Sequence, residues 1–460
     1  MAFTGASIWQ VFLDLSIMTA LLAIGQLLRA KVKIFQTLLI PSALIAGFLA
    51  LALGPRGYDI LPLSKAFGTY AAVFIVVVFA ATPIGDKPSN EALSGPVIGG
   101  MFFNITGIAV LQYAVGMFVT VYGLRYFYPD LPEQFGLMMA TGFYGGHGTA
   151  AAVGNALENL GVAHMTDLAY TCATIGIVGG ILFGMGIINW GSRKGYTHYV
   201  EDPADLPVEL RTGLISPEKQ KSAGKVTVSS ISIDPLAFHL GIVLTAALGG
   251  YYITKWFKVF SGKLGYAVSI PEFCTALLAA FVVNWILNKT GASDYIDRNT
   301  VSRIQGASTD LLMVSGIGSL NLKVVFDYAI PLLVVCTLGF IVTYWWFIYV
   351  GGKASRTDWF ERNMMCWGHA TGVAATGVLL QRVVDPDLKS RGIEDSGISD
   401  LFNRPLIIGL QVIPPIVMSV MPIIGGAVLT WSIFGIVAIM WLVAYKFNWW
   451  VPSQKLMKYR

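Results

Sequence analysis

The sequence predicts an all-α, polytopic membrane protein built from two repeats, each with an interrupted helical hairpin. Three observations lead to this prediction: an apolar composition, apolar stretches of membrane-spanning length, and an order of motifs that recurs in the two halves. Of the 460 residues, 55% are hydrophobic and only 12% are charged. A soluble globule of this size needs a larger charged surface.

Apolar stretches of about 20 residues, the length that crosses a hydrocarbon core of about 30 Å, recur along the whole chain. No Lys or Arg precedes the first stretch and no small-residue cleavage pattern follows it, so we expect a retained span and not a signal peptide. The last stretch is long enough for two spans, which leaves the side of the C-terminus open. The predicted spans are 8–29, 36–55, 66–85, 95–124, 167–191, 236–254, 266–288, 307–320, 325–350 and 403–447.

Charge is sparse and spread among the loops. The formal net charge of +5 argues against a nucleic-acid partner and is ordinary for a membrane protein whose basic loops face the cytoplasm. Arg29, Lys31 and Lys33 directly follow the first span, which predicts a cytoplasmic loop there and an external N-terminus. The lysines of 255–263 fall on the outer side in this scheme, so the rule does not explain every loop.

The residue patterns of common enzymes are missing from the sequence. It contains no GxSxG elbow, no Walker loop and no HExxH pair. We therefore expect that the protein is not an enzyme and binds no cofactor other than a coupling ion. We also expect the energy for any transport to come from an ion gradient. Metal-ligand spacing is missing among the cysteines too, which predicts small buried thiols and no disulfide for Cys172, Cys274, Cys336 and Cys366.

One long polar interval, 193–234, divides the chain nearly in half, and the same motifs occur in the same order on either side of it. "LLIPSALIAGFLA" at 38–50 is matched by "SIPEFCTALLAAF" at 269–281, and "YGGHGTAAAVG" at 144–154 by "WGHATGVAATG" at 367–377. We expect two membrane repeats, 1–192 and 236–460, joined by a cytoplasmic linker at 193–235. Such repeats often have inverted topology, with the cargo between broken helices near the membrane midplane. Chance clustering of glycines is the alternative.

The first glycine-rich motif disfavours a continuous helix. Six glycines lie in 134–157, four of them in 142–148, and each costs a helix about 1 kcal/mol relative to alanine. Within a bilayer, non-helical backbone survives only where protein buries it or where it lines a wet cavity. We expect two short helices here, and the predicted site residues around their meeting point are Thr141, Tyr144, Gly145, Gly146, His147, Gly148 and Thr149.

The second motif repeats this chemistry. We expect its glycines, including Gly377, to flex the chain and its threonines to add hydroxyl groups. Opposed hairpins would enclose one site, in which carbonyl oxygens near Gly145, Gly146 and Gly372 bind Na⁺ and helix N-termini face a carboxylate. Close helix packing through small residues is the alternative. The predicted site residues of this half are Gly368, His369, Thr371, Gly372 and Thr376.

The two histidines of the motifs have several possible roles, and three further polar side chains are candidates for the site. His147 and His369 occupy matching places, where each can bond the hairpin carbonyls and hold their shape, contact the cargo, or carry a proton. Thr171 and Thr174 follow the first hairpin and offer hydroxyl oxygens that suit a hard cation. Arg404 can pair with a carboxylate of the cargo or extend to the membrane interface.

Four stretches resemble signature motifs of the bacterial glutamate:sodium symporter family, in order and approximate spacing along nearly the whole chain. They are "IPSALIAG" at 40–47, "GGHGTAAA" at 145–152, "CATIGIVGG" at 172–180 and "GHATGVAATG" at 368–377. The resemblance implies inverted repeats with re-entrant hairpins, and an elevator-type movement in a homodimer of the bacterial inner membrane. It also implies Na⁺-driven transport of L-glutamate. Gly377 stands where the family usually has a proline, which affects the expected substrate more than the coupling.

These observations together predict a sodium-coupled symporter that imports L-glutamate by alternating access. Bound Na⁺ would complete the site for the anion, because an uncompensated charge is costly in a medium of low dielectric constant. Another small dicarboxylate or amino acid, and coupling to protons, are the alternatives. Two other classes are an ion channel and a haem-bearing electron carrier that uses the two histidines as axial ligands. The expected partners are Na⁺, a small anionic amino acid, membrane lipid and a second copy of the chain.

Overall fold

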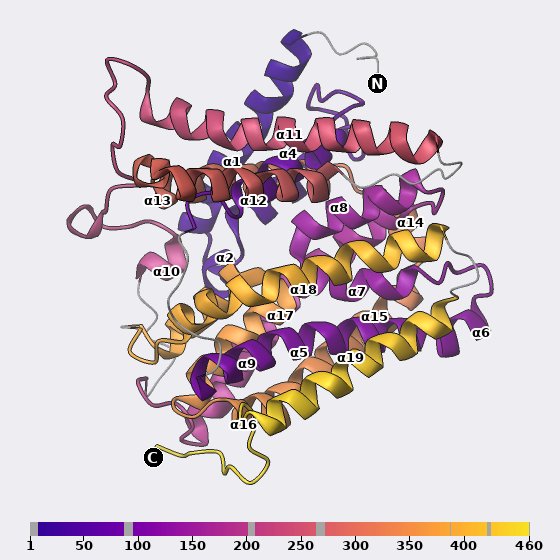
Figure 1. The fold of residues 1–460 in the computed structure, drawn as a ribbon, viewed down its shortest axis with the longest axis vertical. Helices are drawn as coiled ribbons and strands as arrows, with labels where there is room; N and C mark the ends of the chain where they lie inside the picture. Colours follow the sequence, from indigo (N-terminus) through magenta and orange to yellow (C-terminus); the bar gives the residue numbers. More distant parts are fainter. Residues whose placement is uncertain are drawn as a thin grey trace. The chain divides into compact units, whose positions relative to one another are not determined.

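The computed structural model describes residues 8–86, 95–200, 208–263, 272–386, 388–420 and 425–459. Every regular element in these ranges is a helix, and they contain no strand (Figure 1). This confirms the predicted all-α polytopic class. Seven described helical stretches are long and apolar enough to cross a membrane, namely Ile8–Lys31, Pro96–Phe127, Met165–Arg193, Pro235–Phe260, Glu272–Thr290, Ala329–Ala354 and Gly426–Lys446.

The chain forms two compact units, and each takes residues from both sides of the polar interval. The first unit comprises Met1–Lys31, Pro41–Pro88 and Gly213–Leu320, and the second comprises Val32–Ile40, Ser89–Thr212 and Asn321–Arg460. All residues predicted for the site belong to the second unit.

The first unit is a bundle in which α13 packs against α3 and α4 while α11 runs along α12 (Figure 1). Small buried residues allow this close packing: Ala80, Ala246 and Ala276 in one cluster, and Ala46 and Ala50 in another. The helices are α1 (Ile8–Lys31), α3 (Ser42–Leu53), α4 (Thr69–Ala81), η2 (Pro217–Lys219), α11 (Pro235–Lys263), α12 (Glu272–Thr290), η3 (Ala292–Tyr295) and α13 (Arg298–Gly318).

Several predicted spans differ from the helices in their bounds, most of all the second and the last. The span expected at 36–55 is not continuous, because the helix ends near Thr37 and α3 starts only after Pro41, whose ring suits the start of a helix. The span expected at 403–447 is two helices, α18 (Gly392–Val420) and α19 (Gly426–Lys446). Part of the span expected at 266–288 lies outside the described residues, which resume at Glu272.

Asp14 in α1 is fully buried, although the sequence suggests no role for it. Its carboxylate accepts hydrogen bonds from the N–H and hydroxyl of Ser64 (3.0 and 2.5 Å), from the hydroxyl of Tyr70 (3.1 Å) and from the amide of Gln10 (3.1 Å). Four donors offset much of the cost of burying a carboxylate. Asp14 thus ties α1 to the segment that leads into α4.

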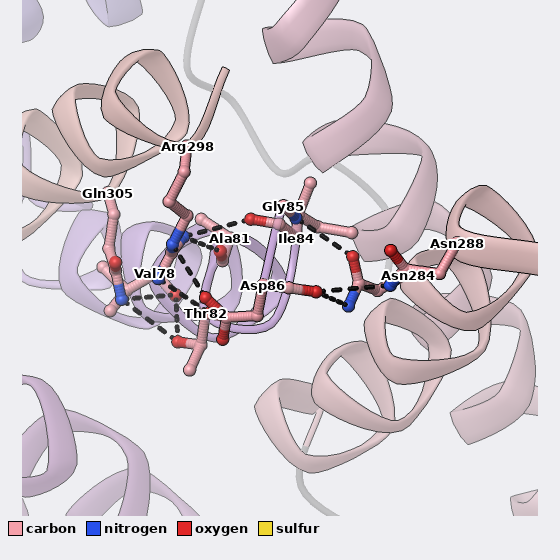
Figure 2. A network of polar contacts seen from close by, with 10 residues as sticks. All are labelled: Val78, Ala81, Thr82, Ile84, Gly85, Asp86, Asn284, Asn288, Arg298 and Gln305. Atoms are coloured by element: carbon pink, nitrogen blue, oxygen red, sulfur yellow. Dashed lines mark hydrogen bonds and ion pairs between the residues drawn. The ribbon is translucent and has the colours of Figure 1, made fainter. Parts of the chain in front are cut away.

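Figure 2 shows how the C-terminal end of α4 is held in the first unit. The last carbonyl groups of a helix have no partner inside it. Arg298, the first residue of α13, supplies one from outside: its guanidinium pairs with Asp86 at 3.0 Å and donates at 3.0–3.1 Å to the carbonyl oxygens of Ala81, Thr82 and Ile84. The planar, multi-donor guanidinium suits this arrangement.

Arg298→Ala is expected to lower the free energy of unfolding by about 3 kcal/mol, because it removes the donor from three carbonyl groups and one carboxylate. Arg298→Lys should lower the free energy of unfolding by less, since lysine keeps the positive charge although it lacks the planar fork of donors. Thermal unfolding of the purified protein measures the effect. Arg303→Ala, an exposed arginine on the same helix, is the control. Equal melting temperatures for Arg298→Ala and the control would contradict the prediction.

The second unit holds the interrupted segments. Within it α9 packs against α7, α8 and α17, and α5 packs against α7, α18 and α19. The helices are α2 (Lys33–Thr37), α5 (Pro96–Val119), η1 (Thr120–Leu124), α6 (Arg125–Phe127), α7 (Phe135–Phe143), α8 (Gly146–Asn159), α9 (Met165–Arg193), α10 (Val208–Thr212), α14 (Leu322–Asp327), α15 (Ala329–Trp346), η4 (Phe347–Gly351), α16 (Gly352–Ala354), α17 (Trp359–Val384), α18 (Gly392–Val420) and α19 (Gly426–Lys446).

Helices α5 and α15 share an irregularity that the sequence did not predict. Each continues into a five-residue π-helical turn, η1 or η4, and then into a three-residue α-helical turn, α6 or α16. An interrupted segment follows in both cases, α7 with α8 in the first half and α17 in the second. Short π-helical turns occur frequently at functional sites. The elements directly before the two interrupted segments, a long helix, a π-helical turn and a short α-helical turn, therefore follow in the same order.

Candidate functional site

The first interruption lies within the predicted glycine cluster. Helix α7 ends at Phe143 and α8 begins at Gly146, which leaves Tyr144 and Gly145 between them. Gly146 has φ +62°, a left-handed conformation that side chains disfavour. Gly148 was expected at the meeting point but lies inside α8. That expectation is wrong, because one left-handed residue is enough to end the regular hydrogen bonding.

The second interruption lies inside α17, at Gly372 (φ −166°, ψ 35°) and Val373 (φ 72°, ψ 167°). The chain doubles back there. A Cβ atom added to Gly368 would lie 2.5 Å from the backbone nitrogen of Gly377, whereas these positions would be about 14 Å apart along a straight helix. The two arms of α17 therefore run against each other.

Gly368 and Gly377 do not flex the chain as expected. Both are helical, and their missing side chains let the two arms touch through the backbone. The packing role that small residues have in membrane helices explains these two positions. Only Gly372, of the three glycines in this motif, has non-helical dihedral angles.

The structure brings the two interruptions together within the second unit. A Cβ atom added to Gly146 would overlap Cγ1 of Val373. The rings of Tyr144 and His369 are stacked, with centroids 4.7 Å apart and planes inclined by 12°. One residue of each interruption, and one aromatic ring beside each, are thus in direct contact.

Helix α9 contributes a third side to this region. Oγ1 of Thr174 lies 3.0 Å from Nε2 of His147, so one predicted ion ligand is bonded to one predicted hairpin histidine. Nδ1 of His147 is buried and has no hydrogen-bond partner among the described residues. A Cβ atom at Gly176 would lie 2.5 Å from the carbonyl oxygen of Thr371, so α9 closely approaches the second interruption as well.

The predicted hydroxyl groups are already partly engaged with backbone carbonyls. Thr171 donates to the carbonyl of Asp167 (2.8 Å), Thr371 to that of Trp367 (2.9 Å), and Thr376 to that of Gly372 (2.5 Å). Each hydroxyl oxygen keeps its lone pairs for another partner, and the Gly372 oxygen keeps one acceptor site. The hydroxyl of Thr141 lies 3.3 Å from that of Tyr113.

Sequence reasoning did not assign site roles to two amides that the structure places in this region. Gln112 of α5 donates to the carbonyl of Ala370 and to the hydroxyl of Thr343, both at 2.9 Å. Asn403 of α18 lies 2.5 Å from the hydroxyl of Tyr144. A polar residue inside an apolar span is the signal that could have singled them out. Arg404 is in α18, but its side chain lies outside the described part of the structure.

The groups at the interruptions are carbonyl and hydroxyl oxygens, amides and imidazoles. No group of three or more His, Cys, Asp or Glu side chains that could hold a metal ion occurs among the described residues. Carbonyl and hydroxyl oxygens are nevertheless good ligands for hard cations. The oxygen atoms at the interruptions are therefore of the chemical kind that binds an alkali cation.

Comparisons with known proteins give a match to a family model and two named relatives. The sequence model of a family described as "Sodium/glutamate symporter" matches residues 9–381. Proteins named sodium/glutamate symporter from Escherichia coli (strain K12) and Shigella flexneri are each 24% identical to this chain over 371 residues, which covers 78% of this chain and 84% of each relative. No solved structure matches.

The family match confirms the resemblance predicted from the four motifs. Together with the seven apolar helices, it confirms the predicted localisation as a multi-pass protein of the bacterial inner membrane. The match covers both interruptions, at Gly146 and at Gly372, and stops just after them at residue 381. This chain belongs to the sodium/glutamate symporter family.

Proposed function

We propose that this protein is a sodium-coupled symporter for L-glutamate, and that the two interruptions of the second unit form its site. The contact between Gly146 and Val373 carries this proposal, because it brings together the two places where the backbone leaves the regular helical conformation. Broken helices of this kind bind ions through freed carbonyls and anions through helix N-termini. The two relatives, which are named sodium/glutamate symporters, supply the identity of the cargo.

Coupling follows from electrostatics. Na⁺ binds carbonyl oxygens near Gly145, Gly146 and Gly372 together with the hydroxyls of Thr171 and Thr174. Its charge offsets the charge of the incoming anion, which is otherwise costly to place in a medium of low dielectric constant. Anion and cation therefore enter together and leave together, as coupled symport requires. His147 keeps the first interruption in shape through its bond to Thr174.

The two halves of the chain act as inverted repeats, 1–192 and 236–460, joined by a cytoplasmic linker at 193–235. In support, each half contributes three early helices to the first unit, α1, α3 and α4 from one half and α11, α12 and α13 from the other. Each half contributes its π-turn helix and its interrupted segment to the second unit. The second unit, which holds the whole site, then carries the cargo in an elevator-type movement relative to the first. Two copies assemble as a homodimer.

Membrane lipid covers much of the outer surface. Large apolar side chains are exposed along α11, among them Leu244 (44%), Leu248 (54%) and Trp256 (64%). Such a run is typical of a helix that faces hydrocarbon. Only 22% of the apolar stretch is buried in α1 and likewise in α19. This exposure also suits helices that face membrane lipid.

Uptake by the purified protein tests the proposed function. Proteoliposomes should accumulate radiolabelled L-glutamate when an inward sodium gradient is imposed, and uptake should collapse when choline replaces sodium. A panel of competing amino acids and dicarboxylates decides the substrate, and a proton gradient without sodium tests proton coupling. Equal uptake with and without sodium would rule out the proposal, and currents far above carrier turnover would indicate a channel instead.

Thr174→Val should raise the sodium concentration for half-maximal uptake by about tenfold, because it removes a hydroxyl ligand and the partner of His147 at once. Thr171→Val should have a smaller effect, since that hydroxyl bonds only to its own helix among the described contacts. Thr430→Val is the control, a buried helical threonine that donates to the carbonyl of Gly426. Sodium titration of initial uptake rates measures all three. Similar values for Thr174→Val and the control would contradict the assignment.

A further inference from the structure

Asn403 occupies a buried position between two hydroxyl groups of the second unit. Its Oδ1 accepts a hydrogen bond from Oγ1 of Thr106 in α5 (2.9 Å), and its Nδ2 donates to the hydroxyl of Tyr144 (2.5 Å). The exposed fractions of Thr106, Asn403 and Tyr144 are 0%, 2% and 6%. Asn403 also lies beyond residue 381, where the family match ends.

Burial makes these two bonds hard to replace. A buried amide or hydroxyl that loses its partner cannot bond to water instead, so breaking either bond costs free energy. Each group is therefore held in position by the other. Exchanging the oxygen and nitrogen of the amide changes which hydroxyl donates but leaves both bonds in place. The hydroxyl end of Tyr144 is therefore anchored to α5 and α18 through one side chain.

Tyr144 passes this constraint to both interruptions. It immediately precedes Gly145 and Gly146 in the first interruption, and its ring is stacked on His369 at 4.7 Å. His369 lies three residues before Gly372 on the same arm of α17. A tyrosine has only two side-chain torsions, so fixing its hydroxyl end also fixes its ring. A series of contacts thus connects α5 and α18 to both interruptions, from Thr106 through Asn403 and Tyr144 to His369.

We propose that Asn403 is a positioning residue of the transport site. Through the Tyr144 hydroxyl it sets the register between the two interruptions, and it does so without touching the cargo. This inference rests on the proposed function for its transport readout. A simple packing bond between α18 and α5 is the competing explanation, and the same helix pair contains one: Ser399 donates to the carbonyl of Ile98 at 3.3 Å.

Kinetics of uptake separate the two explanations. Asn403→Leu and Tyr144→Phe should each raise the KM for glutamate about tenfold and change Vmax less than about twofold, because the site is misaligned but the carrier still moves. Ser399→Ala should match the unmodified protein. The double variant Asn403→Leu/Tyr144→Phe should be no worse than Asn403→Leu alone, since the bond that Tyr144→Phe removes is already lost in that variant. An unchanged KM in Asn403→Leu, or effects that multiply in the double variant, would overturn the inference.

A second readout does not depend on the cargo. Ala370 lies two residues before the second interruption and is buried, as are the four native cysteines. In an Ala370→Cys background, adding Asn403→Leu should accelerate labelling by a maleimide reagent about tenfold, because a loosened site exposes the new thiol more often, whereas adding Ser399→Ala should not. Failure of the unmodified protein to take up glutamate would refute the proposed function alone, because the labelling rates would still decide the inference. Equal labelling rates with Asn403→Leu and with Ser399→Ala would overturn the inference.

Discussion

Gly146→Ala is expected to reduce sodium-dependent uptake by about 100-fold or more. The substitution forces a side chain into a left-handed conformation at φ +62°, and the new methyl group overlaps Cγ1 of Val373. Strain of this kind and overpacking each cost about 1–3 kcal/mol, and 2.7 kcal/mol corresponds to a factor of about 100. Initial uptake rates in proteoliposomes, corrected for the amount of folded protein, measure the effect.

Two further variants isolate the cause. Val373→Ala removes the overlapping atom, so Gly146→Ala/Val373→Ala should recover part of the lost uptake and leave only the cost of the backbone conformation. Gly186→Ala is the matched control, since Gly186 is a helical glycine of α9 with nothing within 4 Å of its added Cβ. Undiminished uptake by Gly146→Ala would show that the two interruptions do not meet as described.

Gly368→Ala is expected to lower the free energy of unfolding by about 3 kcal/mol. Its Cβ atom would lie 2.5–2.6 Å from three backbone atoms of Thr376 and Gly377. Backbone cannot move aside as a side chain can, so the two arms of α17 must separate, and overpacking of this kind costs at least 1–3 kcal/mol. The melting temperature in detergent and the rate of uptake should both decrease.

The sign of this effect distinguishes the doubled-back arms from a continuous helix. In an uninterrupted helix, alanine is more favourable than glycine by about 1 kcal/mol, so Gly368→Ala would stabilise the protein. Gly435→Ala in α19, where nothing lies within 4 Å of the added Cβ, should show that small stabilisation. A melting temperature for Gly368→Ala at or above that of the control would contradict the hairpin in α17.

The spans and the approximate positions of both interruptions could be predicted from the chain alone. Apolar length is a property of consecutive residues, and the conformational cost of glycine is local, so 142–148 and 368–377 could be identified without any tertiary contact. The motifs of the resemblance are likewise local stretches. The proline-rich stretch 403–447 could only be described as long enough for two helices, and the structure shows that it forms two.

The role of each glycine could not be predicted in the same way. Gly146 and Gly372 break their helices, Gly148 remains helical, and Gly368 and Gly377 permit backbone contact between two arms. All five have the same intrinsic helix propensity. What separates them is the neighbour that each one meets, and that neighbour is set by the packing of the second unit.

The sequence by itself determined that this protein is a bundle of apolar helices with two matching interruptions, because hydrophobic length and glycine content act over a few consecutive residues. Only the tertiary structure decided which polar side chains act together. Asn403 and Tyr144 are 259 residues apart in the chain, and Arg298 and Ala81 are 217 apart. A buried hydrogen bond depends on where its partner lies in space, and no local pattern of residues encodes that position.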